Sequence, residues 1–132
     1  MSPTTETEDE RRARLDERAK PILDRIPTPW GKYLSIGEGW YDIVLKLDEQ
    51  IAALYPDYEV QQCKEKFAGL RYYCSVDGAK DVRPLIAAAE EEAGRTCDVC
   101  GKPGEYVNVS RYWVAIRCPG DAVARDAGAQ DA

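Results

Sequence analysis

Residues 58–76 read YEVQQCKEKFAGLRYYCSV, and this stretch decides the fold. Two runs of alternating character, rich in aromatic and β-forming residues, are separated by Ala68-Gly69, which is typical of a β-hairpin with a two-residue turn. A turn at Ala68-Gly69 would place Phe67 opposite Leu70 and Cys63 opposite Cys74. The sequence therefore predicts an antiparallel hairpin with this register.

The side chains of the predicted hairpin separate onto two faces, because successive residues of a strand point to opposite sides. The face expected to pack on a helix holds Cys63, Phe67, Leu70, Tyr72, Cys74 and Val76. The other face is basic and aromatic and holds Lys64, Lys66, Arg71 and Tyr73 together with Gln62 and Ser75. Such a face suits a phosphate and a stacked base, and it is also typical of a solvated outer surface.

A helix is predicted on each side of the hairpin in the sequence. The first, at about 37–54, follows Ser35 and Glu38 at the spacing of a capping box. Its apolar stripe is Trp40, Ile43, Val44, Leu47, Ile51 and Leu54, and its expected outer face is Asp42, Lys46, Asp48 and Glu49. The second, over 80–93, has Pro84 in its first turn and Gly94 as its C-cap.

These elements predict an α+β fold, with a helix, β-hairpin and helix core and a C-terminal zinc-ribbon-like hairpin. We expect residues 35–94 to form the α+β core, 95–122 a zinc-knuckle-like hairpin and 123–132 a disordered tail. Residues 1–34 are expected to be a polar helical leader and a Pro-rich turn. In the first 20 residues Leu15 is the only large apolar residue after Met1, so we expect this helix to bury no face and Pro21 to interrupt it.

The composition narrows the function classes. The 132-residue chain has no His, five Cys and a net charge of −6. The missing imidazole excludes Ser-His-Asp and Cys-His mechanisms, and the net charge argues against indiscriminate nucleic-acid binding. The N-terminus has no signal-peptide pattern and no apolar run is long enough for a membrane span, so a cytoplasmic protein without a membrane partner is expected.

A cysteine knuckle is the clearest chemical motif. Cys97-x-x-Cys100 is followed by Gly101, and Cys118 comes after seventeen further residues, as in zinc ribbons. Where a ribbon places its fourth Cys or His, the chain has Asp121, and Glu105 or a water is an alternative fourth ligand. Three interpretations remain: a structural zinc ion, a knuckle without metal and a catalytic zinc ion. A site without a nearby His is poorly suited to catalyse hydrolysis.

Three segments together resemble small bacteriophage and prophage proteins of uncharacterised function. They are Gly39-Trp40-Tyr41-Asp42, the stretch from Lys64 to Tyr73, and the Cys97-x-x-Cys100-Gly-x-Pro-Gly knuckle. In those relatives the hairpin turn is usually Gly-Gly and the knuckle usually ends in Cys-x-x-His. This chain has Ala68-Gly69 and Cys118-Pro-Gly-Asp121 at these places. The resemblance implies a phage or prophage origin, hence the cytoplasm of a bacterial host, and no established activity.

The expected function is binding rather than catalysis. The leading hypothesis is a non-catalytic phage-type protein that engages a host protein, in counter-defence or host takeover, through Lys64, Lys66, Arg71 and Tyr73 or through Trp30, a loop residue suited to anchor a partner. The alternative is a protein that binds or sequesters a nucleotide or nucleic acid with the same basic face. A metal-dependent enzyme is the third hypothesis. Pairing of open sheet edges makes a homodimer plausible.

Overall fold

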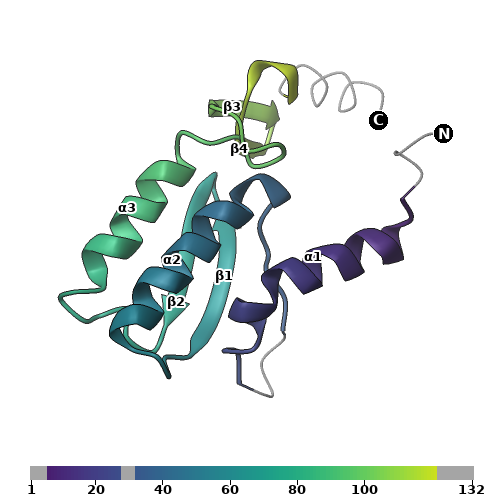
Figure 1. Cartoon of the computed structure of the whole chain (residues 1–132). Helices are drawn as coiled ribbons and strands as arrows, with labels where there is room; N and C mark the ends of the chain where they lie inside the picture. Colours follow the sequence, from purple (N-terminus) through teal and green to yellow (C-terminus); the bar gives the residue numbers. More distant parts are fainter. Residues whose placement is uncertain (1–5, 28–31, 122–132) are drawn as a thin grey trace.

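The computed structural model describes residues 6–27 and 32–121 and has an α+β fold, as predicted. Two separate antiparallel hairpins, β1–β2 and β3–β4, are combined with helices (Figure 1). In chain order the elements are α1 (Glu8–Leu23), the 3₁₀ helix η2 (Glu38–Trp40), α2 (Tyr41–Leu54), β1 (Val60–Lys66), β2 (Gly69–Cys74), α3 (Arg83–Ala93), β3 (Glu105–Ser110) and β4 (Trp113–Arg117). No described helix is long and apolar enough to cross a bilayer.

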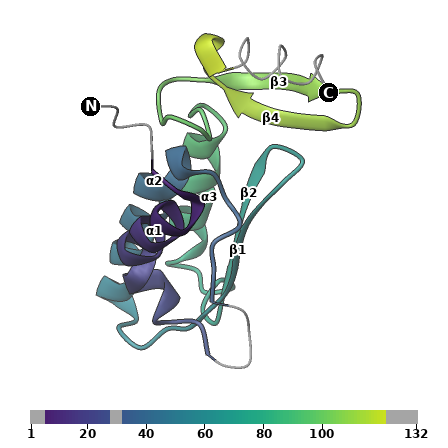
Figure 2. The same cartoon turned by 90° about the vertical axis from the view of Figure 1, so that its right-hand side faces the viewer.

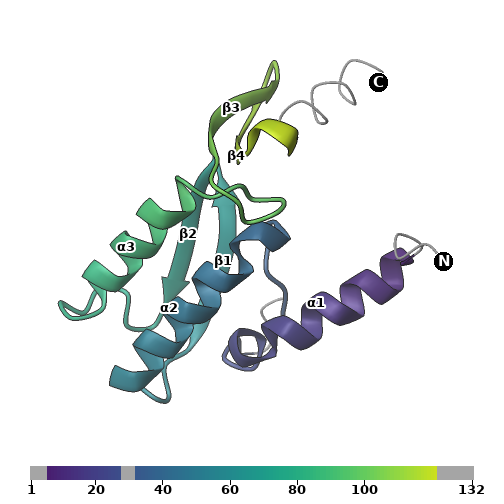
Figure 3. The same ribbon diagram turned by 45° about the horizontal axis from the view of Figure 1, so that its top comes forward.

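The helices and the first hairpin form two layers. Helices α2 and α3 pack together, with α3 also against β2, and α1 packs on α2 (Figure 2). The β3–β4 hairpin lies at one end of these layers. With the top of the molecule tilted forward, α1 crosses away from the axis of α2 (Figure 3). Ser35, which precedes η2, pairs with Lys64 of β1.

The apolar stripe predicted for α2 forms the centre of the core. Its members Trp40, Ile43, Val44, Leu47 and Ile51 are all buried in one cluster with residues of β1, β2 and α3. Leu54 is the exception, because it lies in the last turn and is 47% exposed. Burial of this stripe against the hairpin stabilises the fold through the hydrophobic effect.

The predicted register of the hairpin is wrong by two residues. The turn residues are Phe67 and Ala68, both with positive φ (52° and 69°), as a type I′ turn requires. Lys66 therefore pairs with Gly69, and Cys63 lies opposite Tyr72 rather than Cys74. The two faces keep their predicted character, because a shift of two preserves the alternation. Phe67 alone changes place, from the core to a 76% exposed turn position.

The start of α2 also differs from the prediction. Gly37 precedes the 3₁₀ turn and no side chain caps it, so Ser35 and Glu38 form no capping box. Ser35 instead forms a parallel bridge with Lys64 of β1. The capping box of the described chain is at α1, between Thr7 and Glu10.

Asp48 was expected on the outer face of α2 and is buried instead. Its Oδ1 accepts hydrogen bonds from Tyr58 Oη and from Arg25 Nε, the latter at 2.7 Å. The Tyr58 and Tyr72 hydroxyls are 2.8 Å apart, and Arg25 lies over the Tyr58 ring. This network satisfies a carboxylate that burial alone would penalise heavily.

The N-terminal helix does bury a face, contrary to the prediction. Leu15, Ala19 and Ile22, at helical spacing, are buried against α2 and the chain beside it. Arg14 and Arg18 add ion pairs to Glu38 and Asp42. Pro21 lies within the last turn and does not interrupt the helix.

Candidate functional site

The structure brings Cys97, Cys100, Cys118 and Asp121 together. One ligand atom from each of the four lies within 4.8 Å of all the others. The Asp121 Oδ2 is 3.1 Å from Cys97 Sγ and 3.2 Å from Cys118 Sγ, and the Sγ atoms of Cys100 and Cys118 are 3.5 Å apart. Three sulfur atoms and one oxygen at such separations suit the corners of a tetrahedral metal site.

The first half of this cluster depends on a tight turn after Cys97. Gly101 has a φ of +83°, a conformation that glycine adopts without strain. The Cys97 amide donates to the Lys102 carbonyl at 2.7 Å, and the Val99 amide lies 3.4 Å from Cys97 Sγ. The turn thus aims the Val99 N–H at the Cys97 sulfur, a contact that stabilises a thiolate.

The second half of the cluster comes from the end of β4. Cys118 follows the last residue of β4, and Asp121 lies in the helical turn directly after it. Glu105, the alternative fourth ligand, begins β3, is exposed and is not part of the four-residue group. The carboxylate next to the thiols is therefore that of Asp121.

The knuckle is fixed to the start of α2. The Gly39 amide donates to the Asp98 carbonyl at 3.0 Å, and Trp40 Nε1 donates to the Thr96 carbonyl at 2.8 Å. A Cβ atom on Gly39 would lie 2.2 Å from the Cys97 carbonyl oxygen, so only glycine fits there. The motif Gly39-Trp40 thus has a structural role in seating the knuckle.

Sequence reasoning missed a buried ion pair beside the cysteine cluster. Asp98, between the two cysteines of the knuckle, accepts a hydrogen bond from Arg117 Nε at 2.6 Å. The Arg117 guanidinium also lies over the Trp113 ring. The available signal was a charged residue, Asp98, inside the Cys-x-x-Cys loop. Its partner Arg117 lies nineteen residues further along the sequence, so the pair could not be predicted from local pattern.

The cluster alters the acidity of its own members. Hydrogen bonds from Cys97, Cys100 and Cys118 hold the pKa of Asp121 below its usual value. For Cys100, a backbone hydrogen bond from Lys102 lowers the pKa, but burial and the hydrogen bonds to Asp121, Cys118 and Cys97 outweigh it and raise the pKa to about 12. The carboxylate thus acts as an acceptor for thiol protons, which a metal cation would replace.

The proposed binding residues of the β1–β2 hairpin lie together on its outer face. Lys64 and Arg71 are direct partners across the strands. The Lys64 ammonium lies 6.0 Å from the centre of the Tyr73 ring, and Lys66 lies 5.7 Å from that of Phe67. Within 6–27 and 32–121, none of Lys64, Lys66 and Arg71 forms a salt bridge.

Further exposed aromatic residues lie on the β3–β4 hairpin. Tyr106, Tyr112 and Trp113 are exposed, and Arg111 lies over the Tyr112 ring. Trp30 lies outside the described residues. Cys63 and Cys74 are both buried free thiols, as expected of small core residues, and they do not face each other.

Comparison with known proteins identified no relative of this chain. No protein-family model matches the chain, and neither the curated proteins nor the solved structures gave a match. The resemblance to phage and prophage proteins stays a prediction.

Proposed function

We propose that this chain is a non-catalytic binding protein whose basic hairpin face, Lys64, Lys66, Arg71 and Tyr73, engages an acidic surface of a bacterial host protein. The observation that carries the proposal is that these three cations have no anionic partner among the described residues, in a chain of net charge −6. A cationic patch on an acidic protein is a local feature that selects a complementary surface.

The contrast with other arginines of the molecule supports this interpretation. Arg14, Arg18, Arg25 and Arg117 each form an ion pair with a carboxylate. The fold thus neutralises these four cations, whereas Lys64, Lys66 and Arg71 are among the described cations that form no salt bridge. The paired strands also fix the backbone positions of the three cations, which limits the backbone entropy lost on binding. With a phage or prophage origin, the natural setting is counter-defence or host takeover.

The cysteine cluster has a structural role in this proposal. Three thiolates and the Asp121 carboxylate fit Zn²⁺ better than Mg²⁺ or Ca²⁺, which prefer oxygen ligands. A fourth protein ligand closes the site, as in structural rather than catalytic zinc centres. Bound zinc would hold the two halves of the knuckle together beneath the β3–β4 hairpin.

A nucleotide or single-stranded nucleic acid is the second candidate partner of the same face. The pairs Lys64–Tyr73 and Lys66–Phe67 favour it, because each sets a cation beside an exposed ring on which a base could stack. The overall negative charge disfavours long-range attraction to a polyanion, so the host protein is the first choice.

The test is affinity capture from bacterial host lysate with the full chain and the variant K64E/R71E, followed by a direct binding measurement with the captured protein after its purification. We expect K64E/R71E to lose binding while its thermal unfolding is unchanged. The control K80E/R95E carries the same charge change at two exposed positions away from the face and should bind normally. Equal binding by both variants would overturn the proposal.

The nucleic-acid candidate is tested with the same proteins. A fluorescent single-stranded DNA or RNA oligonucleotide is titrated at low and at physiological salt. If the oligonucleotide binds strongly and in a salt-dependent way, and K64E/R71E abolishes this binding, then the basic hairpin face binds nucleic acid rather than a host protein. If neither an oligonucleotide nor a purified host protein binds this face, both candidates are wrong.

A further inference from the structure

Two sulfur atoms of the cysteine cluster lie close enough to react with each other. Cys100 Sγ and Cys118 Sγ are 3.5 Å apart, and they come from the two halves of the knuckle. The sulfur atoms of a disulfide bond are about 2.05 Å apart, so these two need to approach by only about 1.5 Å. Cys100 is exposed, whereas Cys97 and Cys118 are buried. An oxidant in solvent therefore reaches Cys100 first and finds Cys118 beside it.

The fourth member of the cluster makes a single disulfide bond sufficient to release a metal ion. The cluster holds three thiols and one carboxylate, and a carboxylate cannot form a disulfide bond. Oxidation of Cys100 and Cys118 leaves only Cys97 and Asp121 as ligands, and two ligands do not complete a tetrahedral zinc site. Cys97 then has no thiol partner within the cluster, so the reaction stops at one disulfide bond.

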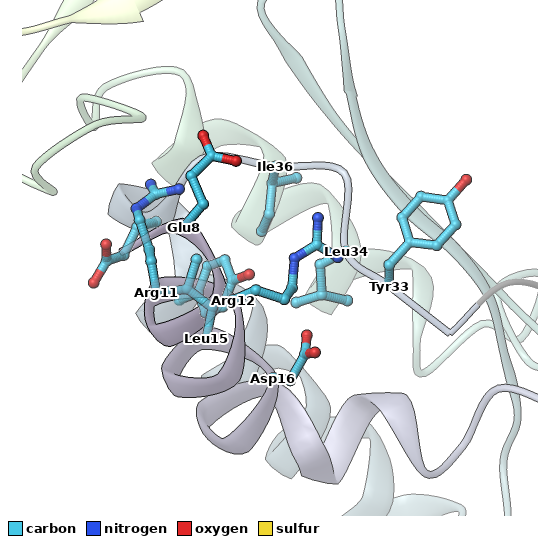
Figure 4. Close-up of a pocket in the computed structure, with 10 residues that line it drawn as sticks. Glu8, Arg11, Arg12, Leu15, Asp16, Tyr33, Leu34 and Ile36 are labelled. Carbon is cyan, nitrogen blue, oxygen red and sulfur yellow. The ribbon is translucent and has the colours of Figure 1, made fainter. Parts of the chain in front are cut away.

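The surroundings of the cluster favour a small, neutral oxidant. A hollow of about 540 Å³ is lined by Val99 and Asp121, and it shares Leu34 and Ile36 with a second hollow of about 310 Å³ between α1 and residues 33–36 (Figure 4). Acidic side chains outnumber arginines along the two hollows; the acids are Glu8, Asp16, Glu38, Glu65, Asp98 and Asp121. Three thiolates and a carboxylate around Zn²⁺ also leave a net negative charge. Such a field repels anionic glutathione disulfide but not hydrogen peroxide.

We propose that the knuckle is a redox-responsive zinc site, in which hydrogen peroxide joins Cys100 and Cys118 in a disulfide bond and thereby releases the metal ion. The inference rests on the structural zinc ion of the proposed function, and it does not depend on which partner the basic hairpin face binds. A metal-bound cysteine has lost its proton, so both sulfur atoms are in the thiolate form that reacts with peroxide.

The reaction has two steps. The Cys100 thiolate attacks one oxygen of hydrogen peroxide, the O–O bond breaks, and a sulfenic acid and a hydroxide ion form. The Cys118 thiolate then attacks the Cys100 sulfur, the S–O bond breaks, and the disulfide bond forms as a second hydroxide ion leaves. The two thiolates have then lost two electrons to the peroxide, which has become two hydroxide ions.

The disulfide bond preserves the knuckle after the metal ion has left. It joins the same two halves across seventeen intervening residues, and closing a loop of this length stabilises a folded chain. The hydrogen bonds that attach the knuckle to Gly39 and Trp40 are accepted by the backbone carbonyls of Asp98 and Thr96, so they need no metal. We therefore expect the oxidised chain to stay folded, with a melting temperature that a chelator does not change.

The test treats the zinc-loaded full chain with excess hydrogen peroxide. A chromogenic chelator follows the released zinc, the remaining thiols are alkylated, and the denatured chain is cleaved on the amino side of aspartate. Cleavage before Asp98 separates Cys97 from Cys100, so the fragment 98–120 holds only Cys100 and Cys118. We expect this fragment to lose two hydrogen atoms and to escape alkylation, while Cys97 is alkylated. One zinc ion should be released for each disulfide bond formed.

Two controls accompany this experiment. The variant C63V/C74V lacks the two thiols of the main core and should release zinc at the rate of the natural chain. Glutathione disulfide, at the same concentration as the peroxide, should release zinc at least about tenfold more slowly because of its negative charge. Dithiothreitol should reduce the disulfide bond and restore the binding of one zinc ion.

The outcomes separate this inference from the proposed function. If the reduced chain binds no zinc, the structural zinc ion and the inference are both wrong. If the chain binds zinc, but peroxide leaves fragment 98–120 unchanged or zinc stays bound after the disulfide bond has formed, the inference alone is overturned. It is also overturned if Cys97 replaces either cysteine in the disulfide bond, if glutathione disulfide acts as fast as peroxide, or if dithiothreitol does not restore zinc binding.

Discussion

Arg117 and Asp98 form a buried ion pair that joins the last strand to the cysteine knuckle, with 2.6 Å between Arg117 Nε and Asp98 Oδ1. The Arg117 side chain is 3% exposed and that of Asp98 12%. The Asp98 amide also donates to the Ile116 carbonyl, and its carbonyl accepts from Gly39. One residue of the knuckle thus contacts both β4 and the start of α2.

Asp98→Ala should destabilise the protein by about 3–5 kcal/mol, because it leaves the Arg117 guanidinium buried without its carboxylate. Urea unfolding followed by circular dichroism gives the free energy of unfolding. Glu91→Ala is the matched control, since it removes the exposed ion pair with Arg95 and should cost less than about 1 kcal/mol. If both variants lose the same free energy of unfolding, the buried Asp98–Arg117 pair contributes no more to stability than the exposed pair.

Zinc should copurify at one ion per chain, and Cys118→Ser should abolish it. Removal of one thiolate breaks a closed four-ligand site, so the variant should also melt at a lower temperature. Elemental analysis and thermal unfolding, with and without a chelator, check both effects. Asp121→Cys creates an all-thiolate set and should bind zinc at least as tightly as the natural chain. If neither the chelator nor Cys118→Ser changes the melting temperature, the protein holds no structural metal at this site.

Ala68→Gly should stabilise the hairpin by about 1 kcal/mol, because Ala68 has a φ of +69° and glycine adopts this conformation without the Cβ clash. Ala88→Gly, at an exposed position inside α3, is the control and should destabilise the protein by about 1 kcal/mol. Urea unfolding measures both. A loss of stability in Ala68→Gly would show that the turn does not have these backbone angles.

Stability should decline at alkaline pH. Burial raises the pKa of the Cys63 thiol from 9.0 to about 12, and burial also raises the pKa values of Tyr58 and Tyr72. A group with a raised pKa in the folded state contributes stability that is complete below its unfolded pKa and is lost as the pH rises toward the folded value. We therefore expect the free energy of unfolding to fall between about pH 9 and 12.

Cys63→Val tests the share of the thiol in this alkaline decline. It removes the titrating group and keeps an apolar side chain of similar size, so its stability should fall less steeply above pH 9 than that of the natural chain. The tyrosine contribution should remain. A flat pH profile for the natural chain would contradict the burial of all three groups.

Much of the fold could be predicted from local patterns. The stripe from Trp40 to Ile51 has helical period, and the spacing of Cys97, Cys100 and Cys118 predicts their convergence without any knowledge of the fold. The hairpin faces were predictable for the same reason. The turn was misplaced because Gly69 is the residue that usually takes positive φ, whereas Phe67 and Ala68 adopt it here.

The errors have a common physical origin in contacts between distant residues. Asp48 is polar, and only Arg25 and Tyr58, brought together by the fold, make its burial favourable. In α1 the spacing of Leu15, Ala19 and Ile22 was a readable signal, but a small alanine and one leucine do not look like a core face until Tyr41 lies opposite. A local sequence pattern does not show which distant residues will be in contact in the folded protein.

The attachment of Gly39 and Trp40 to the knuckle has a consequence for how the protein opens. Residues about sixty positions apart share these hydrogen bonds, at 3.0 Å and 2.8 Å, and Trp40 is fully buried in the main core. The knuckle therefore cannot detach without disturbing the first turn of the central helix. We expect native-state hydrogen exchange to place the amides of both regions in one cooperative unit, so that the C-terminal segment unfolds with the core rather than before it.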